Sequence, residues 1–375
     1  MLEFQVTSVC GKARLGRLGL PHGQVATPAF MPCGTAGSVK GLLPRDLRDC
    51  GVQMLLGNTY HLMLRPGGQA VAELGGLHRL MAWEGPILTD SGGYQVFSLA
   101  KMRTLSDEGV LFQSHVDGSR QMLSPRGCMA IQAQLGADVA MQLDQCPPAD
   151  APYEEVADAV RRSALWAALC RDAWQAGPRP YGYQQSLFGI QQGGVHQDLR
   201  AESARRIVEL DLPGYAVGGL SVGEGPAAMA AVLEHIDGQL PPDKPRYLMG
   251  VGEPRDILAG VARGIDMFDC VLPTRNARNA QAFTWSGRLK LRNAAHARDS
   301  QPLEEDCPCY ACRNFSRGAL RHYFMAGEML GPILLTMHNL SWFGRFMEAI
   351  RQAIADGNLP ARSTQWMEQL YGQQS

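Results

Sequence analysis

The feature that most constrains the fold is a regular alternation of short apolar runs with helical patterns. Eight apolar runs, many rich in β-branched residues, lie at 27–33, 52–58, 86–90, 137–144, 186–192, 214–219, 246–250 and 266–271. Amphipathic helical patterns separate several of them, most clearly at 154–176 and 254–263. Such alternation is typical of a parallel sheet covered by helices. Eight strand–helix units in about 250 residues indicate an α/β fold, a (β/α)8 TIM barrel.

A doubly wound sheet is the structural alternative. No glycine-rich dinucleotide fingerprint follows the first run, which disfavours the Rossmann type but leaves other doubly wound folds open. Two inserted hairpins are predicted, at 112–123 and 282–292, and a C-terminal helix at 340–354. We expect a catalytic barrel with insertions over 1–296. Residues 297–375 should form a zinc-binding subdomain and C-terminal helices packed on the barrel.

The overall charge hides a local imbalance. The chain has 35 basic and 36 acidic residues, a net charge of −1, which ordinarily argues against a nucleic-acid partner. Residues 246–292, however, hold eight basic and four acidic side chains, a balance of +4. This stretch is therefore a candidate for phosphate contacts, with ordinary solvated charge as the alternative. The sequence shows no leader pattern and no run of 18 apolar residues, so we expect a cytoplasmic protein without a membrane partner.

Polar side chains close several of the predicted strands. Asp90, Asp144 and Asp269 end three of the runs, and Gln192 ends a fourth. In a barrel these strand ends share one rim, where catalytic residues lie. A single such Asp is as readily a helix cap or a turn residue. Three carboxyl groups around one pocket can have different pKa values, so we expect glycosyl chemistry with Asp269 and Asp90 as nucleophile and acid or base.

A glycine-rich segment at 217–225 follows the sixth run. Without side chains, its backbone can approach a ligand closely. A phosphate cradle and simple tight turning are both consistent with this pattern. Beside an Asp and a Gln, the segment also suits a flat heterocycle such as a purine, with Tyr94 and Met249 on its two faces.

Ten cysteines divide into two groups. Seven are scattered and are expected to be core thiols: Cys10, Cys33, Cys50, Cys128, Cys146, Cys170 and Cys270. Cys307, Cys309 and Cys312 form C-x-C-x2-C, with His338 as the expected fourth ligand and His322 as the alternative. A closed Cys3His set predicts one structural Zn²⁺ per subunit, because no position stays open for a reacting water.

Four motifs together carry a family resemblance. They are T-D-S-G-G-Y-Q at 89–95, G-G-L-S-V-G-E at 218–224, F-D-C-V-L-P-T-R at 268–275 and the cysteine cluster with His338. Over nearly its whole length the chain resembles the tRNA-guanine transglycosylases, also called queuine tRNA-ribosyltransferases. The resemblance implies replacement of guanine at wobble position 34 of tRNAs with a GUN anticodon. It also implies double displacement through a covalent ribosyl-aspartate intermediate, without a redox or nucleotide cofactor.

The resemblance assigns roles to individual residues. Asp269 would attack ribose C1′, and Asp90 would take a proton from the incoming base. The base would be bound by Asp90, Ser91, Gly92, Gly93, Tyr94, Asp144, Gln192, Gly219, Leu220 and Met249. The RNA would be contacted by Gly250, Val251, Gly252, Glu253, Pro254, Arg255, Asp256, Thr274, Arg275, Asn276, Ala277 and Arg278.

Three positions refine the expectation. Cys146 and Val222 resemble the pocket of bacterial members, in which the valine would exclude queuine and admit the smaller base preQ1. Gln145 stands where the family has Glu. If Gln145 supports the peptide next to Leu220, a neutral amide that both donates and accepts predicts weaker pH dependence of base exchange.

Members of the family are homodimers, which we carry over as an expectation. The sequence leaves two alternatives to base exchange in tRNA. A catalytically silent tRNA-binding subunit is disfavoured because Asp90 and Asp269 are both present. A retaining glycoside hydrolase leaves the cysteine cluster and the basic stretch unexplained.

Overall fold

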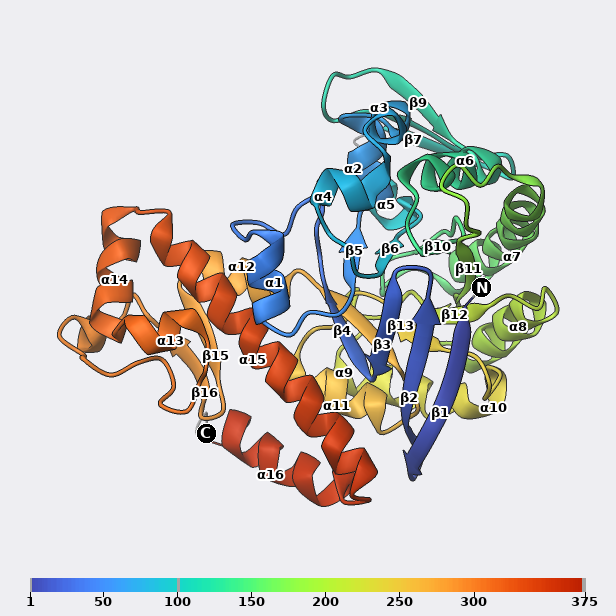
Figure 1. Cartoon of the computed structure of the whole chain (residues 1–375). Coiled ribbons are helices and arrows are strands. Elements are labelled where there is room, and N and C mark those ends of the chain that lie inside the picture. The colour runs from blue at the N-terminus through green and yellow to red at the C-terminus, as the bar shows by residue number, and fades with distance from the viewer. Residues whose placement is uncertain (1, 100–101, 373–375) are drawn as a thin grey trace.

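The computed structural model describes residues 2–99 and 102–372, and an eight-stranded parallel barrel forms its centre (Figure 1). Its strands, in spatial order, are β4 (Ala29–Pro32), β14 (Met267–Cys270), β13 (Arg246–Leu248), β12 (Gly214–Val217), β11 (Ser186–Gln191), β10 (Val139–Met141), β6 (Ile87–Thr89) and β5 (Leu55–Gly57). A parallel bridge between Cys33 and Leu56 brings β5 back to β4. Each strand lies inside one predicted run, so the (β/α)8 prediction is confirmed and the doubly wound alternative is wrong.

Helices surround the barrel. Those of the first half are α1 (Pro44–Asp49), α2 (Thr59–Leu64), α3 (Gly68–Glu73), α4 (Gly76–Met81), α5 (Gly93–Leu99) and α6 (Pro125–Leu135). The others are α7 (Tyr153–Ala176), α8 (Gln197–Val208), α9 (Pro226–Leu233), α10 (Ile236–Gln239), α11 (Pro254–Val261) and α12 (Leu272–Arg278). The predicted helix at 154–176 is confirmed as α7, which has Glu154 and Glu155 in its positive first turn. The helix predicted at 254–263 is observed as α11, which ends two residues earlier, at Val261.

An antiparallel sheet that sequence analysis did not predict precedes the barrel. Its strands are β1 (Glu3–Cys10), β2 (Ala13–Leu20) and β3 (Gly23–Thr27). Arg14 of β2 forms an ion pair with Asp266, which directly precedes β14, and the His22 N–H donates to Asp138, which precedes β10. Because both aspartates come before their strands, the sheet covers the N-terminal end of the barrel, away from the rim that holds the candidate site.

Both predicted hairpins are present. The first is β8 (Gly109–Gln113) with β9 (Arg120–Leu123), and β7 (Arg103–Ser106) adds a third strand that was not predicted. The second is β15 (Gln281–Thr284) with β16 (Gly287–Lys290).

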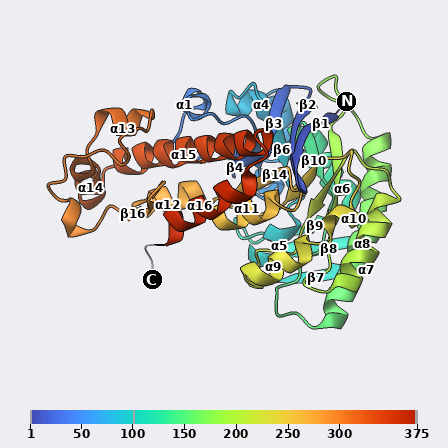
Figure 2. The same cartoon turned by 90° about the horizontal axis from the view of Figure 1, so that it is seen from below.

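The C-terminal region holds more helix than the predicted 340–354. It contains the short 3-10 helix η1 (Ala294–His296), followed by α13 (Tyr310–Asn314), α14 (Arg317–Ala326), α15 (Leu330–Ala355) and α16 (Leu359–Tyr371). Gly327 ends α14 in the left-handed conformation, and α15 begins three residues later. The long helix α15 runs from α13 and α14 to the barrel (Figures 1 and 2). There Phe343 packs on Phe30 of β4, and Arg351 donates to the Pro28 carbonyl at 2.8 Å. None of the described helices combines the length and apolarity needed to cross a bilayer.

Candidate active site

Three buried carboxyl groups occupy the C-terminal rim of the barrel. Asp90 directly follows β6, Asp144 lies three residues beyond β10, and Asp269 belongs to β14. Their exposed fractions are only 7%, 4% and 8%. Burial raises the pKa of Asp90, and the negative charge of Asp269 raises it further. The structure thus brings together the carboxylates that the strand ends predicted.

The two oxygens of Asp269 have different surroundings. Oδ1 accepts hydrogen bonds from the Tyr247 hydroxyl at 2.6 Å and from the Gly250 N–H at 2.7 Å. Oδ2 has the Cys33 thiol at 3.6 Å, a weak donor. Burial raises the pKa of Asp269, and these donors oppose the rise by stabilising the anion. Two strong contacts therefore orient the carboxylate through Oδ1, and Oδ2 has only a weak donor nearby.

Asp90 is a buried carboxyl group with backbone and amide donors. Its Oδ1 accepts from the Thr59 N–H at 2.8 Å, and its Oδ2 accepts from the Asn58 amide. Burial raises the pKa of Asp90 to about 7, against the opposing effect of these donors. A group with a pKa near 7 can both accept and release a proton at neutral pH.

Asp144 and Gln192 form a polar wall beside the carboxylate pair. Asp144 accepts from Ser91 Oγ at 3.1 Å and from Gln192 Nε2 at 2.7 Å. Burial raises the pKa of Asp144 to about 6, while the two donors lower it. Gln192 Oε1 is buried and has no hydrogen-bond partner in the described part of the chain. An unpaired buried acceptor is costly, so this oxygen is a candidate contact for a ligand N–H.

Glycines allow close approach at this wall. A Cβ on Gly218 would lie 2.7 Å from Gln192 Nε2, and one on Gly219 would lie 2.5 Å from Gln192 Oε1. Gly219 also has φ +63°, in the left-handed region. A Cβ on Gly93 would lie 2.6 Å from the Asp144 carbonyl oxygen. Glycine is therefore needed for the backbone to reach these two polar side chains.

The remaining candidate base contacts also lie near the rim. Tyr94 begins the first turn of α5 and is half exposed, and Met249 directly follows β13 and is half-buried. Gly92, with φ +79°, packs against Tyr60, and Leu220 is buried.

Gln145 does not make the contact considered from the sequence. Its N–H donates to Ser163 Oγ at 3.0 Å, and its side-chain oxygen accepts from Arg162 on α7. Among the described residues it forms no hydrogen bond with the peptide next to Leu220. The local reason is the Arg162 guanidinium, which lies within reach of the amide oxygen.

The basic stretch does not form a single surface. Arg246 is completely buried and paired with Asp237, Arg263 is paired with Glu234, and Arg288 is paired with Glu253. Counting charges along a segment could not show this, because a barrel sends successive parts of the chain to opposite ends. Four basic residues of the stretch are exposed: Arg255 of α11, Arg275 of α12, Lys290 at the end of β16, and Arg292. Arg255 and Arg275 lie on the helices that follow β13 and β14.

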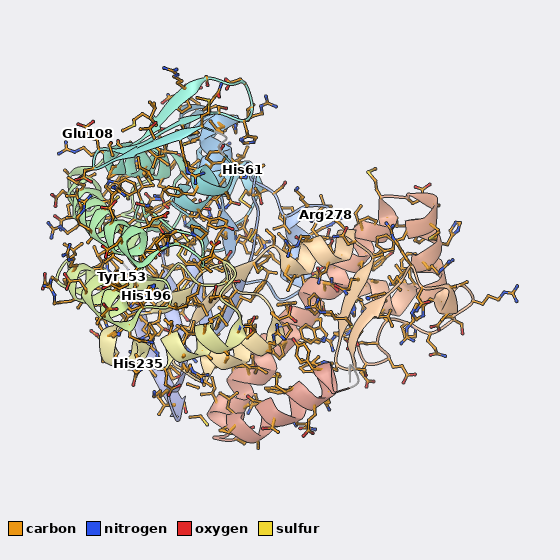
Figure 3. The ribbon with its side chains drawn as sticks, turned by 180° about the vertical axis from the view of Figure 1, so that it is seen from behind. His61, Glu108, Tyr153, His196, His235 and Arg278 are labelled. Atoms are coloured by element: carbon orange, nitrogen blue, oxygen red, sulfur yellow. The ribbon has the colours of Figure 1, made fainter. Side chains whose placement is uncertain are left out.

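The proposed RNA contacts differ in accessibility. Among the twelve candidates, Gly250, Arg255 and Arg275 are exposed, and Glu253, Asp256 and Arg278 are intermediate. The other six are buried: Val251, Gly252, Pro254, Thr274, Asn276 and Ala277. Arg278 ends α12 where that helix meets the C-terminal region (Figure 3). Val251 and Gly252 lie in the turn before α11, whereas Thr274, Asn276 and Ala277 lie inside α12, so these buried residues position the segments rather than face solvent.

The cysteine cluster is assembled with His338 of α15. His338 Nδ1 lies 3.7 Å from Cys307 Sγ, 3.7 Å from Cys309 Sγ and 3.3 Å from Cys312 Sγ. Tetrahedral zinc with these ligands has N···S edges of about 3.6 Å. The His338 Nε2–H donates to the Phe283 carbonyl at 2.7 Å, which leaves Nδ1 as the free lone pair. These four residues fit a closed metal site, whereas His322 is exposed on α14, so the His322 alternative is wrong.

The other seven thiols are all free, but only Cys33, Cys50, Cys128 and Cys170 are buried. Cys10, Cys146 and Cys270 are half-buried, so the core-thiol prediction is wrong for these three. Cys146 and Cys270 follow or end strands at the rim, where the barrel opens.

Sequence reasoning missed the residues that orient the carboxylates. Tyr247 lies inside β13 and looks like an ordinary core aromatic. Asn58 and Thr59 follow β5, where the same search of strand ends would have found them.

A TIM barrel with paired buried carboxyl groups at its C-terminal rim has the arrangement of a barrel enzyme that acts on glycosyl bonds, and its closed Cys3His site is separate from that rim. The family model for queuine tRNA-ribosyltransferase matches residues 10–372. A queuine tRNA-ribosyltransferase of Novosphingobium aromaticivorans is 52% identical over 359 residues, 96% of each chain. Those of Solidesulfovibrio magneticus and Pelotomaculum thermopropionicum are 53% and 54% identical, covering 96% and 92% of this chain and 95% and 92% of theirs. The chain belongs to the queuine tRNA-ribosyltransferase family and is a transferase that modifies tRNA.

Proposed function

We propose that this enzyme replaces guanine at position 34 of tRNAs with a GUN anticodon by preQ1, through a covalent bond between ribose C1′ and Asp269. The observation that carries the proposal is the unequal environment of the two Asp269 oxygens beside Asp90. Oδ1 is held by Tyr247 and Gly250, and Oδ2 is left to attack.

The reaction proceeds in two displacements. Asp269 Oδ2 forms a bond to C1′ while the bond from C1′ to N9 of guanine breaks, and the departing base takes up the proton of Asp90. The incoming base then loses its N9 proton to Asp90 and attacks C1′ as the bond to Asp269 breaks. Two inversions at C1′ retain its configuration. The pKa of Asp90, about 7, suits this proton transfer.

The polar wall recognises the base. Asp144 accepts N–H groups of the guanine-like ring, and Gln192 and the Gly219 amide face its oxo group and neighbouring nitrogens. Val222 is half-buried in the glycine segment, whose turn is held by the Glu224 carboxylate accepting from the Val222 N–H at 3.0 Å. A fixed valine leaves space for an aminomethyl substituent and excludes a cyclopentenediol.

The RNA backbone is held near the rim by Arg255 and Arg275, and the wobble nucleotide leaves its stack to reach Asp269. Cys307, Cys309, Cys312 and His338 hold a structural Zn²⁺ in the subdomain over 297–375. Zinc would stabilise the packing of α13 against α15 and take no part in the reaction. A homodimer is the proposed assembly, which sedimentation with and without tRNA tests.

The test is trapping of the intermediate. Wild-type enzyme, Asp269→Asn and the matched exposed control Asp117→Asn are incubated with unmodified GUN tRNA and separated by denaturing electrophoresis. We expect a protein–tRNA band for wild type and Asp117→Asn and none for Asp269→Asn. A band that persists in Asp269→Asn overturns the nucleophile. Incorporation of queuine without preQ1 overturns the base assignment.

A further inference from the structure

Arg200 is a buried guanidinium at the back of the polar wall. It lies in the first turn of α8, four residues after His196, the residue that caps that helix (Figure 3). Its side chain is completely buried. Burial lowers the pKa of Arg200 to about 10, so it remains a cation at neutral pH. A buried charge is expensive unless it is well hydrogen-bonded, so its partners indicate what it holds in place.

Its partners are backbone carbonyl oxygens from two neighbouring strand ends. Nη1 donates to Gln191 at 3.1 Å and to Gly218 at 2.8 Å. Nε donates to Gly194 at 2.8 Å, and Nη2 lies 3.4 Å from the Gly219 oxygen. The fork of Arg200 thereby joins the segment that carries Gln192 to the segment that carries Gly219.

These bonds fix the direction of the peptide between Gly218 and Gly219. In a trans peptide the N–H points opposite to the C=O. Because the Gly218 carbonyl points at Arg200, the Gly219 N–H points away from it. The Gly219 N–H therefore faces the side opposite Arg200. Gln192 lies against Gly219 there, since a Cβ on Gly219 would be 2.5 Å from Gln192 Oε1, and this is where the base pocket is proposed.

We propose that Arg200 is a positioning residue that fixes the Gly218–Gly219 peptide so that the Gly219 N–H donates to the oxo group of the bound base. The inference rests on the proposed function, since it requires a guanine-like ligand. A lysine could not replace the arginine, because one ammonium group cannot span carbonyls on two strand ends as a planar fork does.

The chain offers two matched controls on the same helix. Ser203 is also buried on α8, but its hydroxyl accepts from the Gln192 N–H at 2.9 Å and does not contact the Gly218–Gly219 peptide. Arg205 is exposed and paired with Glu202 and Glu209. Ser203→Ala measures the effect of losing another buried hydrogen bond of α8, and Arg205→Lys measures the effect of an arginine-to-lysine change at an exposed position of the same helix.

The experiment measures the preference for an oxo over a thio group. Inhibition constants of guanine and 6-thioguanine are compared for wild type, Arg200→Lys, Ser203→Ala and Arg205→Lys, with thermal unfolding recorded for each. Sulfur is a weaker acceptor, so wild type and both controls should prefer guanine by about tenfold, the equivalent of one hydrogen bond. In Arg200→Lys the preference should fall to about twofold, because the donor is no longer aimed at the oxo group.

The outcomes separate the two proposals. If wild type binds neither base, the proposed function fails. If wild type prefers guanine and folded Arg200→Lys keeps the full preference, only the role of Arg200 fails. Should Arg200→Lys not fold, Arg200→Gln replaces the fork by a neutral amide, which leaves no charge to bury and cannot hold carbonyls on both strand ends. Loss of the preference in that folded variant supports the role of Arg200, and its retention overturns that role.

Discussion

The Tyr247→Phe substitution tests how Asp269 is kept ionised. The Tyr247 hydroxyl donates to Asp269 Oδ1 at 2.6 Å, and both side chains are buried. A hydrogen bond to a charged group contributes about 1.5–3 kcal/mol. The hydroxyl favours the anion, so its removal raises the pKa of Asp269, by about 1–2 at 1.36 kcal/mol per unit. The Gly250 N–H remains as the second donor, so the carboxylate keeps its orientation.

The assay is the pH dependence of kcat/KM for incorporation of labelled guanine into tRNA. Because Asp269, as the proposed nucleophile, must be ionised, the acid limb should move upward by about 1–2 pH units in Tyr247→Phe. Tyr215→Phe is the matched control: Tyr215 is buried on the neighbouring strand β12, and its hydroxyl oxygen accepts from the Leu212 N–H at 3.1 Å. An unmoved acid limb, with a rate lowered equally at every pH, would refute the reasoning.

Two further predictions concern stability. Burial raises the pKa of Asp90 from 3.8 to about 7, so its contribution to stability is fully present below pH 4 and is lost as the pH rises through 7. The side chain of Asp90→Asn cannot ionise. The free energy of unfolding of this variant, relative to that of wild type, should therefore rise by on the order of 4 kcal/mol between pH 4 and pH 8. Urea unfolding at both pH values checks this, and a difference independent of pH contradicts it. For the metal site, Cys309→Ser should lose bound zinc and melt about 5 °C or more below wild type, whereas Cys170→Ser, at a buried thiol outside the cluster, should keep its zinc. Elemental analysis and thermal unfolding measure both, and full zinc occupancy in Cys309→Ser refutes the ligand assignment.

The barrel strands were predictable because each is a short apolar run, and several of these runs end in a polar residue. Asp90, Asp144 and Gln192 could be found for the same reason, since strand order alone brings their ends to one rim. The N-terminal sheet was not predicted, although β2 buries Ala13, Leu18 and Leu20. Four of the eight residues of β2 are glycine or arginine, and they obscure the alternation of apolar and polar residues that indicates a strand.

The sequence could not show which residue each side chain contacts in the folded barrel. Arg246 and Arg275 look alike in a count of charge, yet one is buried at the N-terminal end and the other is exposed near the rim. Gln145 could reach either α7 or the glycine segment, and only the position of Arg162 decides between them. Arg200, 19 residues before Gly219, has no motif that marks it.

The pairing of β4 with β14 determines when the active site can exist. Phe30 is in register with Phe268 and Met31 with Asp269. The first barrel strand therefore cannot form this pairing until the last barrel strand has been synthesised. More than 200 residues separate them, a long-range contact that is slow to form. On the ribosome, a growing chain holds Asp90 and Asp144 long before Asp269 is synthesised. Under the proposed mechanism, the attacking oxygen therefore arrives on the strand that closes the barrel, and partly made chains would lack the group that bonds to RNA.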